Sequence, residues 1–237
     1  MYRILEGGTD AASMVLFDPA ALPDDFDVRQ RQDPLEQIES LMHAGKLYWL
    51  QTCADGGHEL GVYVDTPLPD QLTPYAKRLD TLDRFHVPSG RLFFTGIEYA
   101  FHADDADLRK HPSMGEATEL AAGIYRAEFF EFDYPPEFHD GLLQQRLPAA
   151  QLRIHSLMNT LVPIGCISFL ALLGVLYWSW KNGWASIAIP FLVILIVLPL
   201  IVSRLPAYRR ANAVYKDIQK EFLGYAVVLQ RDAAATR

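Results

Sequence analysis

The chain has 237 residues and a formal net charge of −8, and 50% of its residues are hydrophobic. This apolar content excludes a disordered chain, which would lack the side chains needed to form a core. The two cysteines, Cys53 and Cys166, exclude a disulfide framework and a zinc site built from cysteines alone.

Short strands and one helix are predicted in the first 45 residues. Strands are expected at 2–5 and 13–17, joined through a turn at Gly7-Gly8. A helix is expected to begin at Pro34, because proline is favoured in the first helical turn and an aspartate precedes it as a cap. The acidic stretch 19–32 between them is predicted to be a loop.

A hairpin and a second helix are predicted next. The stretches 47–53 and 60–65 alternate as strands do, and the turn residues 54–57 between them favour a direct pairing of the two strands. Thr73-Pro74 is typical of a helix start, and leucines three residues apart follow on one side.

Two longer strands are predicted at 91–102 and 123–134, the first preceded by a turn at 88–90. In the second strand the apolar side chains change phase between Phe129 and Phe130, which indicates either a bulge or a bend between two sheets. The sequence therefore predicts an α+β domain with a mainly antiparallel, β-rich sheet.

Two long apolar segments follow a predicted linker helix at 142–156. The segments 157–180 and 184–203 contain no charged residue, and about 20 apolar residues suffice to cross a bilayer as a helix. Only three residues connect them, so they are predicted to form an antiparallel transmembrane hairpin. No ionisable residue lies inside either segment, which argues against a channel or a transporter.

A C-terminal amphipathic helix is predicted after the second apolar segment. Apolar side chains recur there at alternating spacings of three and four. They are Tyr208, Ala211, Tyr215, Ile218, Phe222, Tyr225 and Leu229. Such a helix could lie along the membrane, pack on the rest of the chain or bind a second copy. The hairpin offers a second route to a homo-oligomer.

Four parts of the chain are predicted from these patterns. They are an acidic cytoplasmic α+β domain at 1–141, the linker helix at 142–156, the transmembrane hairpin at 157–203 and a cytoplasmic helical tail at 204–237. Seven Lys and Arg residues flank the hairpin and one lies in its turn, and positive residues stay on the cytoplasmic side. Acidic residues near the N-terminus interrupt any signal peptide. The prediction is a bacterial inner-membrane protein with both termini in the cytoplasm.

Charge is unevenly distributed along the chain. Residues 1–156 carry 26 Asp and Glu against 13 Lys and Arg. An acidic domain repels nucleic acid and fits a basic protein partner, although the same charge could serve only solubility.

No catalytic motif occurs in the sequence: phosphate loops, dinucleotide fingerprints, HExxH and GxSxG are absent. Three weaker groupings remain. Cys53 and His58 could form a thiol–imidazole dyad, and the cluster 102–111 could hold a divalent cation, although its spacing matches no known cation loop. Glu128, Glu131 and Asp133 could act as paired carboxylates, or as charges on a solvent face. The prediction is a protein without catalytic residues, metal or cofactor.

Two Gly-bounded segments suggest a family. Residues 89–96 (SGRLFFTG) and 123–130 (GIYRAEFF) resemble the strands of small β-rich domains in membrane-anchored immunity proteins of bacterial toxin–immunity loci, which include those served by contact-dependent and type VI secretion. The resemblance covers residues 45–135. It implies an inner-membrane protein that neutralises a cognate toxin.

Three functions are consistent with these observations. The first is a non-catalytic binding protein whose acidic domain captures a basic protein partner, such as a toxin. The others are an adapter or sensor subunit of a membrane complex and, less favoured, a membrane-surface enzyme. The predicted contacts with the partner are acids on loops: Asp24, Asp25, Asp27, Asp104, Asp105 and Asp107.

Overall fold

The chain forms two compact units. The computed structural model describes residues 1–30, 34–101, 111–182 and 188–232. Met1–Tyr134 and Phe222–Arg237 make up one unit, called the β unit here, and Pro135–Glu221 make up the other, called the helical unit. The β unit is therefore built from two stretches of sequence, with the whole helical unit inserted between them.

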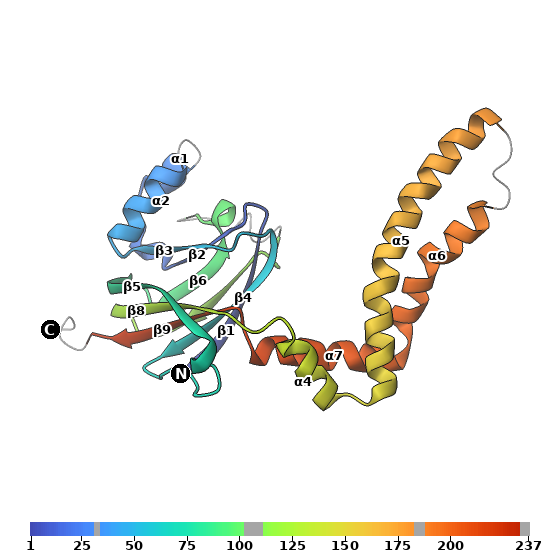
Figure 1. Cartoon of the computed structure of the whole chain (residues 1–237). Helices are drawn as coiled ribbons and strands as arrows, with labels where there is room; N and C mark the ends of the chain where they lie inside the picture. The colour runs from blue at the N-terminus through green and yellow to red at the C-terminus, as the bar shows by residue number, and fades with distance from the viewer. Residues whose placement is uncertain (31–33, 102–110, 183–187, 233–237) are drawn as a thin grey trace. The chain divides into compact units, whose positions relative to one another are not determined.

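The β unit contains two sheets (Figure 1). The five-stranded sheet has the order β1 (Tyr2–Thr9), β4 (Gly56–Val64), β9 (Tyr225–Arg231), β8 (Gly123–Phe132) and β5 (Ala76–Val87). The four-stranded sheet has the order β3 (Leu47–Gln51), β2 (Ser13–Phe17), β6 (Arg91–Gly96) and β7 (Gly115–Glu119). All strand pairs are antiparallel except β4 with β9. The predicted α+β class with mainly antiparallel strands is confirmed.

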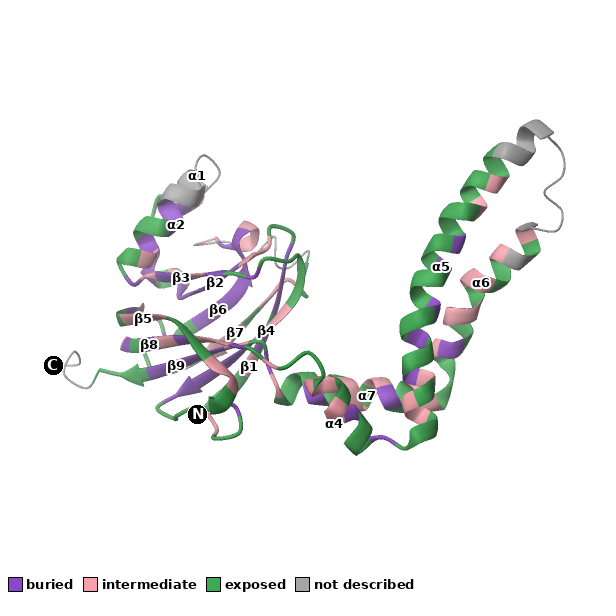
Figure 2. Cartoon of the chain, viewed as in Figure 1, coloured by how far each residue is buried: buried purple, intermediate pink, exposed green. Residues whose placement is uncertain are grey.

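The main core lies between the two sheets, where the inward side chains of both are buried (Figure 2). Strand β2 is buried on both faces: Met14 and Leu16 face this core, whereas Val15 and Phe17 face a second core. That second core is covered by α1 (Phe26–Gln30) and α2 (Pro34–His43). The helix start predicted at Pro34 is thus correct, and it supplies the layer that closes the four-stranded sheet.

The predicted turn at Gly7-Gly8 is wrong, because both glycines lie inside strand β1. A side chain at Gly7 would begin 2.7 Å from the Met14 methyl group, and one at Gly96 would begin 2.6 Å from the Gly8 carbonyl oxygen. The glycines allow β1 to pass close to β6. The strand predicted at 91–102 ends earlier than expected, at Gly96.

The predicted hairpin of 47–53 with 60–65 is also wrong. Strand β3 pairs with β2 in one sheet, and β4 pairs with β1 in the other. The turn residues are present, but Cys53 has a left-handed φ of 57° and the chain crosses there between sheets. Asp55 stabilises this crossing, because its carboxylate accepts a hydrogen bond of 2.9 Å from the backbone N–H of Ala12.

The helix predicted from Thr73 is a single 3₁₀ turn, η2 (Thr73–Tyr75), followed directly by strand β5. Two irregularities in β5, between Arg78 and Asp80 and between Leu82 and Phe85, shift its register against β8. In a regular strand every second side chain faces inward, but an inserted residue places the next inward side chain three positions further along. This spacing imitates that of a helix and explains the wrong prediction.

The change of phase predicted at Phe129 and Phe130 is real, but β8 itself has no extra residue. Phe129 faces the core between the sheets, and Phe132 faces a third core on the outer side of the five-stranded sheet. Phe130 packs against that outer core as well. The bulge or bend expected in this strand is therefore wrong: β8 pairs with β9 without interruption, both of its faces meet a core, and the register shifts lie opposite, in β5.

The C-terminal helix is correct only in part. Helix α7 (Pro206–Glu221) forms as predicted, but the chain then becomes strand β9, between β4 and β8. The predicted helical tail is therefore wrong from Phe222 onward. Gly224 separates the helix from the strand, and Val227 and Leu229 are fully buried in the main core. Burial of these β-strand side chains outweighs their helix-like spacing.

The helical unit contains α4 (Phe138–Arg146), α5 (Ala149–Asn182), α6 (Ala188–Arg204) and α7. The linker helix predicted at 142–156 is divided, because Pro148 lacks the N–H that a continuous helix needs. Helices α5 and α6 run side by side (Figure 1), and a side chain at Gly165 of α5 would begin 3.3 Å from the Pro199 ring of α6.

One helix of the described residues is long and apolar enough to cross a membrane, over Ala149–Tyr177 of α5. A second candidate is the pair Leu192–Arg204 and Pro206–Glu221, which is bent by 71°. The first predicted span therefore corresponds to a clear apolar helix. The two-span hairpin as a whole stays a prediction.

Candidate protein-binding surface

The acids predicted to contact a partner fall into two sets. Asp24 and Asp25 form an exposed turn ahead of α1, and Asp27 lies half-buried in the first turn of that helix. The second set, Asp104, Asp105 and Asp107, lies outside the described residues. The candidate surface is therefore the segment 22–28, called the acidic loop here.

A buried carboxylate fixes the chain just before the acidic loop. Asp18 is fully buried, and its carboxylate accepts hydrogen bonds from the backbone N–H and the hydroxyl of Ser89, both at 2.7 Å. It also accepts one from the backbone N–H of Ala20 at 2.9 Å. Hydrogen bonds to a charged acceptor are stronger than neutral ones. They connect the start of the loop to the turn at 88–90, which the sequence predicted.

A buried aromatic ring fixes the other end of the acidic loop. The Phe26 side chain is fully buried in the core under α1 and α2. Its backbone N–H donates to the Pro23 carbonyl at 2.9 Å, and its own carbonyl accepts from the Gln37 amide at 3.2 Å. The exposed acids are thus carried on a rigid frame, which lowers the entropy lost when a partner binds.

An exposed apolar side chain adjoins these acids. Val28 is 61% exposed and follows Asp27 directly in α1. Association between proteins combines charged contacts at the rim with apolar contacts at the centre. The acidic loop presents both kinds of group within a few residues.

The predicted thiol–imidazole dyad is not supported by the geometry. The His58 ring nitrogen Nε2 lies 3.1 Å from the Ala54 carbonyl oxygen, and the ring packs edge-on against Tyr225 at 6.3 Å. Burial raises the pKa of the Tyr225 phenol, and the negative charges of Glu131 and Cys53 add to the effect. Tyr225 is therefore a neutral group at pH 7, and the contacts described for the His58 ring are with Ala54 and Tyr225.

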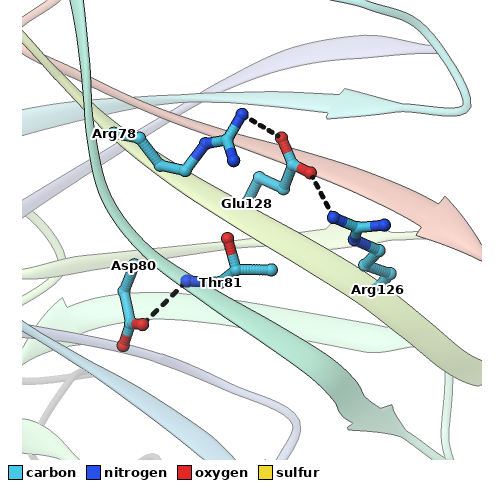
Figure 3. A network of polar contacts seen from close by, with 5 residues as sticks. All are labelled: Arg78, Asp80, Thr81, Arg126 and Glu128. Atoms are coloured by element: carbon cyan, nitrogen blue, oxygen red, sulfur yellow. Dashed lines mark hydrogen bonds and ion pairs between the residues drawn. The ribbon is translucent and has the colours of Figure 1, made fainter.

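Two carboxylates of β8 pair with cations, and Figure 3 shows one of them, Glu128, between Arg78 and Arg126. Glu128 lies 3.0 Å from Arg126 and 3.5 Å from Arg78, and Glu131 lies 3.9 Å from Lys77. Glu128 and Glu131 are thus engaged with cations on the surface of the sheet and not with each other. Across the described parts of the chain, no three His, Cys, Asp or Glu side chains are grouped to hold a metal.

The sequence did not reveal the role of Asp18. Its position before Pro19 is typical of a cap, and it does cap the short helix η1 (Pro19–Ala21). Its second partner, Ser89, is 71 residues away, and no local pattern indicates that contact.

Comparison with known proteins gives only distant likenesses. No family model and no curated protein matches the chain. A structure titled "Crocagin biosynthetic gene J" is 18% identical with a TM-score of 0.38, over 55% of this chain and 75% of that one. ComJ from Bacillus subtilis, an inhibitor of the DNA-degrading activity of NucA, is 12% identical with a TM-score of 0.33, over 58% of this chain and 84% of its own. Likenesses at this level do not define a shared fold or function.

Proposed function

We propose that the chain is a membrane-anchored, non-catalytic protein whose β unit binds a protein partner, and that this partner is a basic toxin that the chain neutralises. The observation that carries the proposal is the place where the helical unit is inserted. The chain leaves the five-stranded sheet after β8 and returns as β9, and these two strands are paired neighbours from Tyr125 with Arg231 to Glu131 with Tyr225. The binding unit and its membrane anchor are thus joined by two connections.

This insertion constrains how the chain can cross a membrane. Both ends of the helical unit return to the same folded sheet, so the chain between them crosses a bilayer an even number of times. If α5 crosses, α6 carries the chain back. We therefore propose the two-span hairpin at 157–203, with the β unit and both termini on one side of the membrane. The positive residues that flank the hairpin favour the cytoplasmic side of a bacterial inner membrane.

A reporter enzyme that is active only outside the cytoplasm tests this topology. Fused before Met1 or after Arg237, it is expected to be silent, and inserted at Gly183 in the turn of the hairpin it is expected to be active. Activity at one terminus and not at the other would reject an even number of crossings. Activity at both termini with silence at Gly183 would place the β unit outside the cytoplasm.

The acidic loop is the proposed contact with the partner. Asp24 and Asp25 are exposed and Asp27 is half-buried, and the excess of acids in residues 1–156 gives a negative field around the loop. Such a field attracts a basic protein and speeds its association, an effect that is screened over about 8 Å at physiological salt. A basic toxin fits this surface better than a nucleic acid or an anionic lipid does.

Substitution of the loop acids tests this contact, once cross-linking from native membranes has identified the partner. The triple variant with Asp24→Asn, Asp25→Asn and Asp27→Asn is expected to slow association about tenfold at low salt, because steering by charge accelerates association by about 10- to 1,000-fold. Its melting temperature should change little. The control carries Asp70→Asn and Asp83→Asn, two exposed acids elsewhere in the β unit. Equal association rates for the triple variant and the control would remove the loop from the interface.

Protection of living cells tests the toxin itself. Cells that express the partner are expected to grow only when the full chain is present, and the triple loop variant should protect them less than the control does.

An adapter or sensor subunit is the second candidate, because α7 leads directly into the buried strand β9 and connects the membrane part to the core of the β unit. Copurification of stoichiometric membrane subunits, with no toxic partner, would favour that role.

A further inference from the structure

A groove of about 570 Å³ lies in the helical unit, between α4 and the first turns of α5. Its lining is mixed. Leu143 and Leu157 contribute apolar walls, and the polar groups include Asp140 from α4 and Arg153, Ser156 and Thr160 from α5. The three polar residues of α5 are three and four positions apart and therefore lie on one face of that helix. A hollow with convergent polar groups and apolar walls is the usual form of a small-ligand site.

The groove contains two opposite charges that do not neutralise each other. Asp140 and Arg153 are both exposed, and within the described parts of the chain neither forms an ion pair. A few residues away, Arg146 and Glu221 pair at 2.7 Å, so charges in this unit do pair where they can reach. Asp140 and Arg153 both line the groove, so a ligand that carries a positive and a negative group finds an opposite charge for each.

The groove lies at the depth of a headgroup in the proposed membrane arrangement. Arg153 precedes the uncharged segment by one turn, and Thr160 is in the first turn inside it. These two residues are separated by about 10 Å along the helix, whereas the polar region of one leaflet is about 5–8 Å thick, so the groove spans the headgroups and reaches the start of the hydrocarbon. Leu157 in the groove wall and Ile164 beyond it are both exposed on α5 and offer a path for an acyl chain.

Resting on the proposed membrane function, we propose that this groove binds a phospholipid whose headgroup joins a phosphate to a primary ammonium, as in phosphatidylethanolamine. The Arg153 guanidinium and the Ser156 hydroxyl donate hydrogen bonds to the phosphate. The Asp140 carboxylate accepts one from the ammonium. Thr160 lies deeper and donates toward the ester oxygens. A choline headgroup has no N–H to donate to Asp140, and a glycerol headgroup has no positive charge.

Lipid binding to the purified full chain in detergent tests this site. Native mass spectrometry would follow titration with the dihexanoyl forms of phosphatidylethanolamine, phosphatidylcholine and phosphatidylglycerol. Phosphatidylethanolamine is expected to bind about tenfold more tightly than the other two, because it alone can form the charge-assisted hydrogen bond from its ammonium to Asp140. Arg153→Gln should weaken it about tenfold, by the same reasoning. Asp140→Asn should abolish its advantage over phosphatidylcholine.

Arg209→Gln is the matched control, because Arg209 is an exposed cation of α7 and does not line the groove. It should leave the preference unchanged. Equal binding of the three lipids, a preference for phosphatidylglycerol, or a full response in Arg153→Gln would overturn the site. Free phosphoethanolamine that binds as tightly as the lipid would overturn the lipid as its ligand.

The failure of this site is distinguishable from failure of the proposed function. Carbonate extraction of cells shows whether the full chain is embedded in a membrane. A chain that is released into solution contradicts the proposed anchor. A chain that stays in the membrane fraction and shows no headgroup preference contradicts the lipid site alone.

Discussion

Gly45→Ala is expected to lower the free energy of unfolding of the β unit by at least about 3 kcal/mol, close to the largest losses that single substitutions cause. Gly45 ends helix α2 in the left-handed conformation, with a φ of 67°. Its N–H donates to the Met42 carbonyl, and the next N–H, of Lys46, donates to the Leu41 carbonyl at 2.9 Å. Glycine is the residue that such a helix end favours.

The close approach of strand β5 makes this position more sensitive than an ordinary helix end. A side chain at Gly45 would begin 1.7 Å from the Arg84 carbonyl oxygen, which belongs to the backbone and cannot rotate away. The Gly45 carbonyl also accepts a 2.8 Å hydrogen bond from the His86 N–H. Alanine would therefore separate α2 from β5, in addition to a backbone strain of about 1–2 kcal/mol.

Denaturant unfolding of the purified full chain, followed by the fluorescence of Trp49 in a background with Trp178→Phe, Trp180→Phe and Trp184→Phe, would measure this loss. Gly56→Ala is the control, because Gly56 also has a positive φ, 123°, but no atom lies within 4 Å of the added carbon. It measures the strain of a positive φ without a collision, although its φ lies farther from the left-handed well. A loss of only about 1–2 kcal/mol in Gly45→Ala, the left-handed strain alone, would show that the contact with Arg84 has no importance.

Local patterns predicted individual elements of this fold well. Strand β2 has the predicted bounds, 13–17, because its apolar run is flanked by turn residues. Helix α2 begins at the predicted proline. The turn at 88–90 also forms, with Gly90 at a φ of 77°. In each case the residues that determine the conformation are next to one another in the sequence.

Local patterns did not predict which distant segments of the chain pair with each other. The division of β3 and β4 between two sheets depends on β1 and β2, whose paired residues lie about 30 to 60 positions earlier. Strand β9 pairs in parallel with β4, whereas its apolar spacing continues the stripe of α7. This segment forms a strand and not a helix because its side chains are buried at the centre of the sheet, between β4 and β8.

The candidate site shows the same division. The exposure of Asp24 and Asp25 agrees with their predicted place on a loop, and their role in binding a partner stays a prediction. The frame that holds them, Asp18 with Ser89, was not predicted because it connects distant residues. The groove between α4 and α5 was missed because a single linker helix was expected where two helices form.

The junction of the two units indicates that the β unit can be separated from its anchor. At the point where the helical unit departs, the Phe132 N–H donates to the Gly224 carbonyl at 2.9 Å. The Tyr134 hydroxyl donates to the Leu223 carbonyl at 3.1 Å. The ends of β8 and β9 are thus as close as those of an ordinary β-hairpin, and a short turn can connect them.

Replacement of Pro135–Glu221 by a Gly-Ser turn of about four residues is expected to give a folded, water-soluble β unit. It removes every long apolar helix that the structure describes and retains β9 between β4 and β8.

Truncation after Tyr134 instead is expected to unfold the unit. It removes the buried side chains of Val227 and Leu229, each of which contributes about 1.5–3 kcal/mol, and it leaves the inner edges of β4 and β8 unpaired. Size-exclusion chromatography and circular dichroism of the two variants would measure the difference. A truncated variant that folds as well as the joined one would contradict the central place of β9, and a joined variant that aggregates would show that the β unit needs its helical insertion to fold.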